Sequence, residues 1–421
     1  MASLKVAGTV RVPGDKSISH RSLILASLAD GGSRIRGILE SEDVRSTAGV
    51  LRALGAPVPA LGADMRVEGV GLRGLRSPAE TLDCGNSGTT TRLMAGVVAA
   101  HPFSARFGGD ASLSRRPMRR VAEPLTEMGA QFEFDHQDGL PMTVRGTNLR
   151  SVDWSTGGSS AQVKSAILLA GLVSAVEVRV IETTRSRDHT ERMLRAMGVD
   201  VESDRNQVWL RPARRLTPME IDVPADPSSA AFFVALAALA SEGELTLTDV
   251  CLNPTRTGFM EAMKRMGADI NESARMSKAG DETGTVRVRP TQLHGIRITD
   301  VEVPSLIDEL PLIACVAAGA GIDVEITGAA ELRVKESDRI NAVVENLRAV
   351  GAHAVELPDG LRVSGPRREL AGTIDPRGDH RIAMAFGVLS AASGDHITVT
   401  NPECVAVSYP GFWEDLRRIA A

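Results

Sequence analysis

Positively charged side chains stand at the starts of several expected helices in this chain. A helix N-terminus already attracts anions, because its first N–H groups have no partner within the helix and its dipole is positive there. A lysine or arginine at such a place therefore indicates a phosphate or carboxylate ligand. Seven cations recur at equivalent places along the chain: Lys16, Arg21, Arg116, Arg187, Lys335, Arg339 and Arg381. Few carboxylates accompany them, so the set predicts a site for multiply charged anions, each phosphate carrying about −1.5 to −2 charges.

Two acidic positions could add proton transfer to this anion site. Asp308, followed by Glu309, opens an apolar helix with no basic partner nearby in sequence. Glu336 stands between Lys335 and Arg339, which we expect to share one face of a helix start. Asp308 and Glu336 could therefore act as general acid and base. Taken alone, however, a charged run of this kind is usually a salt-bridged surface turn.

Other polar openings are less specific. Lys16, Ser17 and Arg21 share a helix face at one-turn spacing. The segment Asn86-Ser-Gly-Thr-Thr-Thr-Arg92 is rich in small residues that allow close backbone approach by a ligand, although an ordinary turn and helix cap has the same composition. Asp226-Pro-Ser-Ser has no positive charge and indicates a structural cap.

A hidden repeat positions these openings. The pattern [LM]-x-x-[LMV]-G-[AV] occurs five times, and its glycines are spaced by 74, 69, 69 and 84 residues. The repeated glycines are Gly55, Gly129, Gly198, Gly267 and Gly351. Each unit begins at a polar opening, continues as helix, strand and second helix, and ends that helix at the glycine, where a left-handed cap is easiest. Helices are expected over 16–28, 89–99, 162–172 and 412–419.

The repeat predicts an α/β protein of two similar lobes with three units each. The strand-like start of the chain has no unit of its own, so we expect it to complete the sixth unit near the C-terminus. The chain would then cross between lobes near Pro13-Gly14 and Val223-Pro224. The first lobe would span 14–223, and the second 1–13 plus 224–421. Two unrelated α/β domains would leave the regular spacing unexplained.

Composition excludes several classes of protein. The chain has 421 residues, 43% hydrophobic, 3% aromatic and 24% charged, with net charge −5, which gives no reason to expect nucleic acid. Its longest uncharged apolar stretch, 227–241, is shorter than the roughly 17–25 residues of a membrane span. The start shows no apolar signal region, and the four cysteines form no CxxC pair. We therefore expect reduced core thiols in a cytoplasmic protein, and no nucleotide, metal or other cofactor; the motifs HExxH and GxSxG are absent.

Eight segments follow one another over nearly the whole chain: Val12-Pro-Gly-Asp-Lys-Ser-Ile-Ser-His-Arg21, Cys84-Gly-Asn-Ser-Gly-Thr89, Arg116-Pro-Met, Ser160-Ala-Gln162, Ser186-Arg-Asp-His-Thr190, Ile307-Asp-Glu, Leu332-Arg-Val-Lys-Glu-Ser-Asp-Arg339 and Asp379-His-Arg-Ile-Ala-Met384. Together, and in this order, they resemble the 5-enolpyruvylshikimate-3-phosphate synthase family. The resemblance implies an inside-out α/β barrel with three βαβαββ units per lobe. It also implies transfer of the enolpyruvyl group of phosphoenolpyruvate to the 5-hydroxyl of shikimate 3-phosphate, with release of phosphate, in the pathway to chorismate and aromatic amino acids.

The resemblance also implies roles for single residues. Shikimate 3-phosphate would be held by Lys16, Ser17, Arg21, Ser160, Ala161, Gln162, Arg187, Asp308 and Lys335. Phosphoenolpyruvate would be held by Lys16, Gly88, Arg116, Gln162, Arg339 and Arg381. Asp308, assisted by Lys335, would take the 5-hydroxyl proton, and Glu336 would move a proton on and off the methylene carbon. Lys16 would touch both substrates, and His380 would support the proton-transfer network. The lobes are expected to close when shikimate 3-phosphate binds, and the protein to be a monomer.

The sequence departs from the family pattern at one place and leaves two alternatives open. Many members carry a lysine within the segment Cys404-Val-Ala-Val-Ser-Tyr-Pro410, which here has none, so one phosphoenolpyruvate contact is missing. Gly88 stands where glyphosate-tolerant members commonly have alanine, which predicts sensitivity. The sister family acting on UDP-N-acetylglucosamine typically has a loop cysteine, and Gly108-Gly-Asp-Ala-Ser-Leu lacks one. A non-catalytic anion-binding module is the other alternative, against which the intact Asp308, Lys335 and Glu336 argue.

Overall fold

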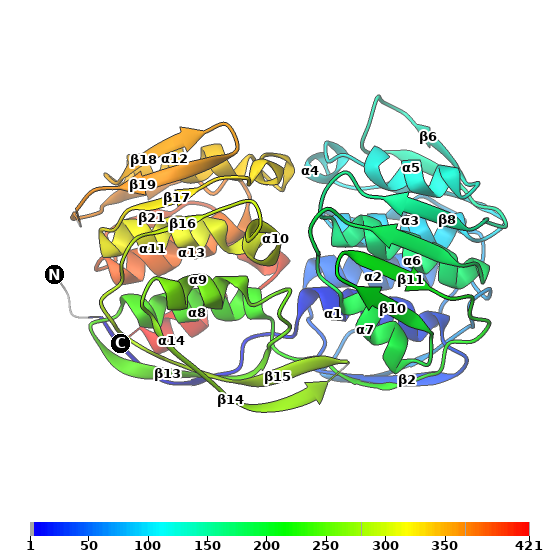
Figure 1. Cartoon of the computed structure of the whole chain (residues 1–421), viewed down its shortest axis with the longest axis horizontal. Helices are drawn as coiled ribbons and strands as arrows, with labels where there is room; N and C mark the ends of the chain where they lie inside the picture. The colour runs from blue at the N-terminus through cyan, green and yellow to red at the C-terminus, as the bar shows by residue number, and fades with distance from the viewer. Residues whose placement is uncertain (1–3, 279, 367, 421) are drawn as a thin grey trace. The chain divides into compact units, whose positions relative to one another are not determined.

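The computed structural model describes residues 4–278, 280–366 and 368–420, which divide into two compact lobes (Figure 1). The first lobe consists of Gly14–Val223 together with Ser277–Asp281. The second lobe contains the described residues of 4–13, 224–276 and 282–420.

The first lobe alternates helices and strands. Its elements are α1 (Lys16–Leu28), β2 (Gly32–Arg36), α2 (Glu42–Ala53), β3 (Asp64–Glu68), β4 (Leu82–Asp83), α3 (Gly88–Ala99), β5 (Ser104–Gly108), α4 (Ala111–Ser114), α5 (Arg119–Glu127), β6 (Gln131–Phe134), β7 (Met142–Arg145), β8 (Val152–Ser155), α6 (Ala161–Ser174), β9 (Val178–Ile181), α7 (His189–Ala196), β10 (Val201–Asp204), β11 (Gln207–Leu210) and β12 (Glu220–Asp222).

The second lobe follows the same plan. Its elements are β1 (Lys5–Val10), α8 (Pro227–Leu239), β13 (Glu242–Cys251), α9 (Gly258–Arg265), β14 (Asp269–Lys278), β15 (Asp281–Arg289), β16 (Ile296–Ile298), α10 (Val303–Leu306), the 3₁₀ turn η1 (Ile307–Glu309), α11 (Leu310–Ala320), β17 (Val324–Ile326), η2 (Ala330–Val334), α12 (Arg339–Ala349), β18 (His353–Leu357), β19 (Gly360–Ser364), β20 (Gly372–Ile374), α13 (His380–Ala392), β21 (Ile397–Val399), η3 (Pro402–Val407) and α14 (Phe412–Ile419).

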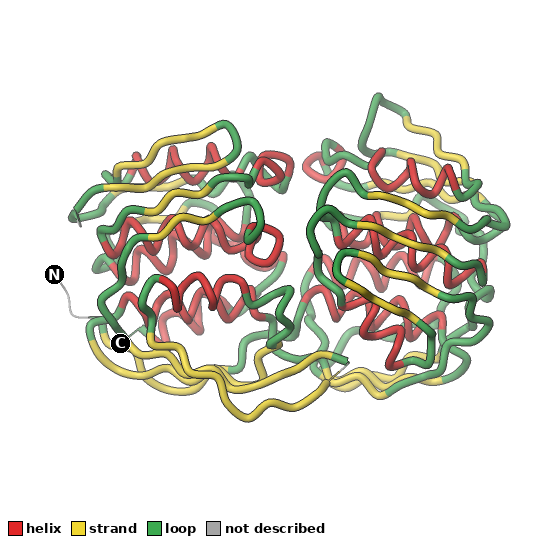
Figure 2. The backbone as a smooth tube through the Cα atoms, in the orientation of Figure 1, coloured by secondary structure: helices red, strands yellow, loops and turns green. Residues whose placement is uncertain are grey.

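Each lobe places its most apolar helices inside and its sheets outside (Figure 2). Helices α1, α3 and α6 in the first lobe, and α8, α11 and α13 in the second, are buried on nearly all sides. A helix that is apolar all round must lie in a core. The strands alternate buried and exposed residues instead, as β3 does, because a sheet with one solvated face buries every second side chain. The expected inside-out α/β barrel fold is confirmed.

The sheets repeat one pattern of pairing. In β16-β17-β19-β18 the first two strands are parallel and the remaining pairs are antiparallel. The order β8-β9-β11-β10 in the first lobe has the same pattern. In the described residues of the sixth unit, the sheet consists of the parallel pair β20-β21.

The repeated glycines end the second helix of their units, as expected. Helices α2, α5, α7, α9 and α12 each stop two residues before the glycine. The φ angles of the five glycines lie between +85° and +119°. Only glycine adopts this region without strain, so the motif marks a helix C-terminus. The helices expected over 16–28 and 412–419 have those bounds in the structure.

The expectation that the N-terminal strand completes the sixth unit is wrong. Strand β1 pairs in parallel with β13 over six residues. Strand β13 belongs to the fourth unit and follows its first helix, α8. Strand β12, which precedes the fourth unit in sequence, pairs with β2 instead and so leaves the place beside β13 to β1. The N-terminal strand does lie near the C-terminal end of the described chain, where it packs against α14 and Val6 forms a bridge with Ala420.

Two further features of the second lobe were not expected. The tip of the β14–β15 hairpin, Ser277–Asp281, belongs to the first lobe, so the chain passes between lobes at more places than the two predicted. Residues Val303–Ala320 are long and apolar enough to cross a membrane by length and composition alone, but 72% of this stretch is buried in the protein, and α10, η1 and α11 divide it.

Candidate functional site

In the first lobe, Lys16 opens α1. The side chain of Asp15 caps this helix by accepting a hydrogen bond from Ile18 N at 2.8 Å. Lys16 forms an ion pair with Asp43 of α2, a carboxylate that the sequence did not single out. The Lys16 ammonium is therefore held at the helix N-terminus by a partner that leaves it partly exposed.

Arg21 lies one turn further along α1 and is almost fully buried. Its guanidinium donates to Ser17 O at 3.0 Å, to Ser165 Oγ of α6 at 2.7 Å and to Thr190 Oγ1 of α7 at 2.6 Å. These three acceptors are neutral groups, and they fix the position of the guanidinium. The guanidinium of Arg21 thus links α1, α6 and α7.

The start of α3 brings a second set of predicted residues together. Gln162, at the start of α6, accepts from Arg92 Nη1 at 2.5 Å and donates to Thr89 Oγ1 at 3.0 Å. A Cβ on Gly88 would lie 2.8 Å from Arg92 Nη1 and 3.6 Å from Arg116 Nη1. The absence of a side chain at Gly88 therefore lets the Arg92 guanidinium lie close to its backbone, with Arg116 beside it.

Arg116 is buried, unlike the basic residues next to it in the sequence. Its guanidinium donates to Asn86 O at 3.2 Å and to Asn86 Oδ1 at 2.6 Å, whereas Arg115 and Arg119 are exposed. The following helix begins at Arg119, two residues after Pro117. Asp110 caps the short α4 before it.

The remaining first-lobe candidates lie at two other places. Ser160 caps α6, accepting from Val163 N at 3.4 Å, and Ala161 and Gln162 follow it at the partly exposed helix start. Arg187 lies in the segment before α7 and is partly exposed.

In the second lobe, Arg339 is the centre of an ionic cluster. Its side chain is 1% exposed and donates to Asp379 Oδ2 at 2.7 Å, to Glu336 Oε2 at 2.6 Å and to Asp308 Oδ1 at 3.2 Å. Burial disfavours the charge, but the surrounding carboxylates raise the pKa of Arg339 overall. The guanidinium is thus a permanent cation that fixes three carboxylates.

Asp308 faces three cations. Besides Arg339, its carboxylate lies 3.8 Å from Lys335 Nζ and 3.8 Å from Arg381 Nη2. Burial lowers the pKa of Lys335, and the charge of Arg339 acts in the same direction, while Asp308 opposes the shift. A lysine with a lowered pKa beside a carboxylate is suited to exchange a proton.

The structure corrects one expectation about this cluster. Lys335 and Arg339 do not share a helix face, because η2 ends at Val334, Lys335 has an extended backbone, and α12 begins only at Arg339. The loop between them carries Glu336, and Asp338 caps α12. Ion pairs with Asp308, not helical spacing, bring the two cations together.

His380 follows the cap of α13. Asp379 accepts from Arg381 N at 3.0 Å, so one carboxylate caps the helix and holds Arg339. His380 is buried at the first residue of α13, between Asp379 and Arg381 in sequence.

Carboxylates are more numerous around the cations than the sequence indicated. Four carboxylates, Asp308, Glu309, Glu336 and Asp379, contact the three second-lobe cations. Asp43 contacts Lys16 in the first lobe. The expectation of few carboxylates is wrong, because most of the compensating acids are distant in sequence from the cations that they contact. Sequence reasoning gave no site role to Asp43, Arg92 and Asp379, although the last two lie in segments that it singled out.

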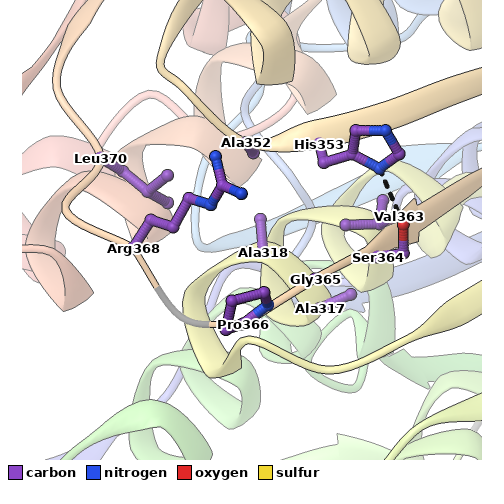
Figure 3. Close-up of a pocket in the computed structure, with 10 residues that line it drawn as sticks. All are labelled: Ala317, Ala318, Ala352, His353, Val363, Ser364, Gly365, Pro366, Arg368 and Leu370. Atoms are coloured by element: carbon purple, nitrogen blue, oxygen red, sulfur yellow. Dashed lines mark hydrogen bonds between the residues drawn. The ribbon is translucent and has the colours of Figure 1, made fainter.

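Neither of two surface hollows coincides with these residues. A cavity of about 10 Å³ beside His353 and Ser364, whose side chains are hydrogen-bonded at 2.8 Å, has room for about one water molecule (Figure 3). A wider hollow of about 820 Å³ lies against α13 and α14 near Trp413 and contains no predicted site residue.

Both lobes thus gather cations at or near helix starts, and in the second lobe carboxylates form ion pairs with them. The fold is that of the enolpyruvyl transferases. The enolpyruvyl transferase NikO from Streptomyces tendae matches with a TM-score of 0.73 over 99% of this chain and 95% of its own, and at 18% identity this likeness shows the fold alone.

The chain belongs to the EPSP synthase family, whose model, EPSP synthase (3-phosphoshikimate 1-carboxyvinyltransferase), matches residues 2–416. The 3-phosphoshikimate 1-carboxyvinyltransferase of Persephonella marina is 47% identical over 99% of this chain and 97% of its own. That of Xanthomonas campestris pv. campestris is 46% identical over 96% of this chain and 93% of its own. The EPSP synthase structure from Acinetobacter baumannii has a TM-score of 0.87 and 38% identity over 100% of this chain and 97% of its own. The family resemblance in the sequence is confirmed.

Proposed function

We propose that the protein transfers the enolpyruvyl group of phosphoenolpyruvate to the 5-hydroxyl of shikimate 3-phosphate and releases phosphate. Family membership over residues 2–416 carries this proposal. It is supported by the presence of every residue to which the family pattern gives a role, apart from the C-terminal lysine. The reaction would place the protein in the pathway to chorismate and aromatic amino acids.

In this proposal the first lobe binds the phosphate of shikimate 3-phosphate. Ser17, Arg21, Ser160, Ala161, Gln162 and Arg187 would hold this substrate. The hydrogen bonds that fix Arg21 before any ligand arrives support its part, because a preset guanidinium loses little conformational entropy on binding. Ser160 and Ala161 lie at the start of α6, where free N–H groups favour a phosphate.

Phosphoenolpyruvate would bind to cations from both lobes. Lys16, Gly88, Arg116 and Gln162 are the first-lobe contacts, and Arg339 and Arg381 those of the second. Gly88 would matter through the Cβ it lacks, since a Cβ there would press against the guanidinium of Arg92, beside Arg116. Arg92 is added to the set because its guanidinium lies against Gln162.

The proton transfers would belong to the second lobe. O5 of shikimate 3-phosphate attacks C2 of phosphoenolpyruvate while Asp308, assisted by Lys335, takes the O5 proton. Glu336 delivers a proton to C3, which turns the methylene into a methyl group and completes a tetrahedral intermediate. Glu336 then removes a proton from that methyl group as the C2–O bond to phosphate breaks. His380 would support this network from the start of α13.

The charge of the two substrates supports a site built from many cations. The two substrates bring about six negative charges. Preorganised cations stabilise such charge strongly when water is scarce around them. We further propose that the enzyme works as a monomer in the cytoplasm and needs no cofactor.

The direct test is to identify the product. Incubation with both substrates should give a vinyl ether at O5 and one phosphate for each phosphoenolpyruvate consumed, as followed by ³¹P NMR and mass spectrometry. Unchanged substrates, with correctly folded protein, would contradict the proposal. A pyruvate product would contradict it too, because hydrolysis needs no acceptor.

A further inference from the structure

The segment that carries Arg187 is held on both sides. Arg187 is partly exposed, but its neighbours Ser186 and Asp188 are 4% and 3% exposed. This segment has no helix or strand assignment, since β9 ends at Ile181 and α7 begins at His189. Its position therefore depends on side chains and not on a backbone ladder.

A first buried cluster fixes the segment before Arg187. Lys164 of α6, 1% exposed, lies 2.8 Å from Glu182 Oε2 and 2.8 Å from Glu191 Oε1. Glu182 in turn accepts from the backbone N of Ser186 at 3.3 Å and from its hydroxyl. Burial opposes the charge of Lys164, but Glu191 and Glu182 raise its pKa overall, so it remains a cation.

A second buried cluster fixes the segment after Arg187. Asp281, at the tip of the β14–β15 hairpin, accepts from His189 Nδ1 at 2.7 Å, and both side chains are 0% exposed. Its other oxygen lies 3.3 Å from Arg192 Nε, which also donates to Asp188 Oδ1 at 2.9 Å. The hairpin tip is therefore joined through two side chains of α7 to the residue that follows Arg187.

Stability alone does not account for these clusters. Buried ion pairs cost desolvation, and apolar residues of similar volume often stabilise a protein as well or better. Lys164 stands in a helix whose other buried side chains are apolar or small. Ionic and hydrogen-bonded groups fix the orientation of their side chains, because each must point at its partner.

We propose that Lys164, Glu182 and Asp281 are positioning residues that preset Arg187 for the phosphate of shikimate 3-phosphate. The inference rests on the proposed function, in which Arg187 binds that substrate. A misplaced binding group costs up to about 100-fold for a shift of ~1 Å, so partial loosening should weaken shikimate 3-phosphate binding about tenfold.

The test compares two isosteric variants with a matched control. Asp281→Asn and Glu182→Gln each remove one buried charge and keep the side-chain shape. Asp226→Asn is the control, because Asp226 forms a buried ion pair with Arg256 at 3.1 Å and caps α8 of the second lobe, away from Arg187 in the sequence and in the other lobe. All three should lose stability in urea unfolding. Only Asp281→Asn and Glu182→Gln should raise the Kd for shikimate 3-phosphate about tenfold, with kcat and the KM for phosphoenolpyruvate within about twofold.

A double-mutant cycle with Arg187→Ala separates positioning from general damage. If the clusters act through Arg187, Asp281→Asn should add less than about twofold to the Kd of Arg187→Ala. Full additivity, or a Kd unchanged in both charge variants, would overturn the inference. An unchanged Kd in Arg187→Ala itself would instead show that the role of Arg187 in the proposed function is wrong. If Glu182→Gln does not fold, Asp281→Asn decides the matter alone.

Discussion

Asp308→Asn keeps the size of the side chain and removes the charge that three cations surround. If Asp308 takes the proton from the 5-hydroxyl, losing it should lower kcat by about 10²–10⁴-fold, or about 3–5 kcal/mol of barrier. The structure also predicts the sign of the effect on binding. Lys335 Nζ, Arg339 Nη1 and Arg381 Nη2 lie 3.2–3.8 Å from this carboxylate. Without its charge they attract an anion more strongly, so the KM for phosphoenolpyruvate should stay equal or fall.

The assay is steady-state phosphate release with each substrate varied in turn. Urea unfolding checks that the variant is folded. We expect a folded variant because Arg339 keeps its bonds to Asp379 and Glu336. Asp300→Asn, an exposed carboxylate of the same lobe, is the control and should leave both constants unchanged. A kcat within threefold of the unsubstituted enzyme, together with a raised KM, would refute the assignment of Asp308 as the base.

Three more substitutions test separate parts of the site. Burial, with the charges of Lys16 and Arg21, lowers the pKa of His20 well below its usual 6.5. The unfolded chain then binds a proton that the folded protein does not, so stability should fall by about 1.4 kcal/mol per pH unit below about pH 6.5, and His20→Asn should remove this slope in urea unfolding at several pH values. Gly88→Ala should raise both the KM for phosphoenolpyruvate and the glyphosate concentration for half inhibition, because its Cβ would lie 2.8 Å from Arg92 Nη1; unchanged glyphosate inhibition would contradict the steric argument. Arg339→Lys should lower the free energy of unfolding by about 2 kcal/mol, since one ammonium cannot replace the guanidinium's bonds to three carboxylates, each charge-assisted bond being worth about 1.5–3 kcal/mol; a change below about 0.5 kcal/mol would show that the cluster tolerates lysine.

Local signals in the sequence are sufficient for the helix ends that carry a cap. The repeated glycines indicate left-handed helix caps because only a residue without Cβ is unstrained there, and all five have positive φ. The polar openings indicate N-caps, and Asp15, Ser87, Ser160, Asp226 and Asp379 accept hydrogen bonds from their helices. Both signals depend on neighbours within a few residues.

Pairings between distant segments could not be derived in this way. Strand β1 was assigned to the wrong unit because the outcome depends on where β12 pairs, some 200 residues away. Lys335 was expected on a helix, but ion pairs with Asp308 set its place. Lys164 was overlooked because its neighbours form an apolar run, and its partners, Glu182 and Glu191, are 18 and 27 positions further on.

The most direct test of the proposed function is phosphate release from phosphoenolpyruvate with two acceptors, each offered alone. We expect release with shikimate 3-phosphate and none with UDP-N-acetylglucosamine, and Glu336→Gln should then lower kcat by about 10²–10⁴-fold. Release only with the nucleotide sugar would contradict the acceptor assignment and the roles given to Arg21 and Arg187. No release with either acceptor would contradict catalysis itself and leave the protein as an anion-binding module.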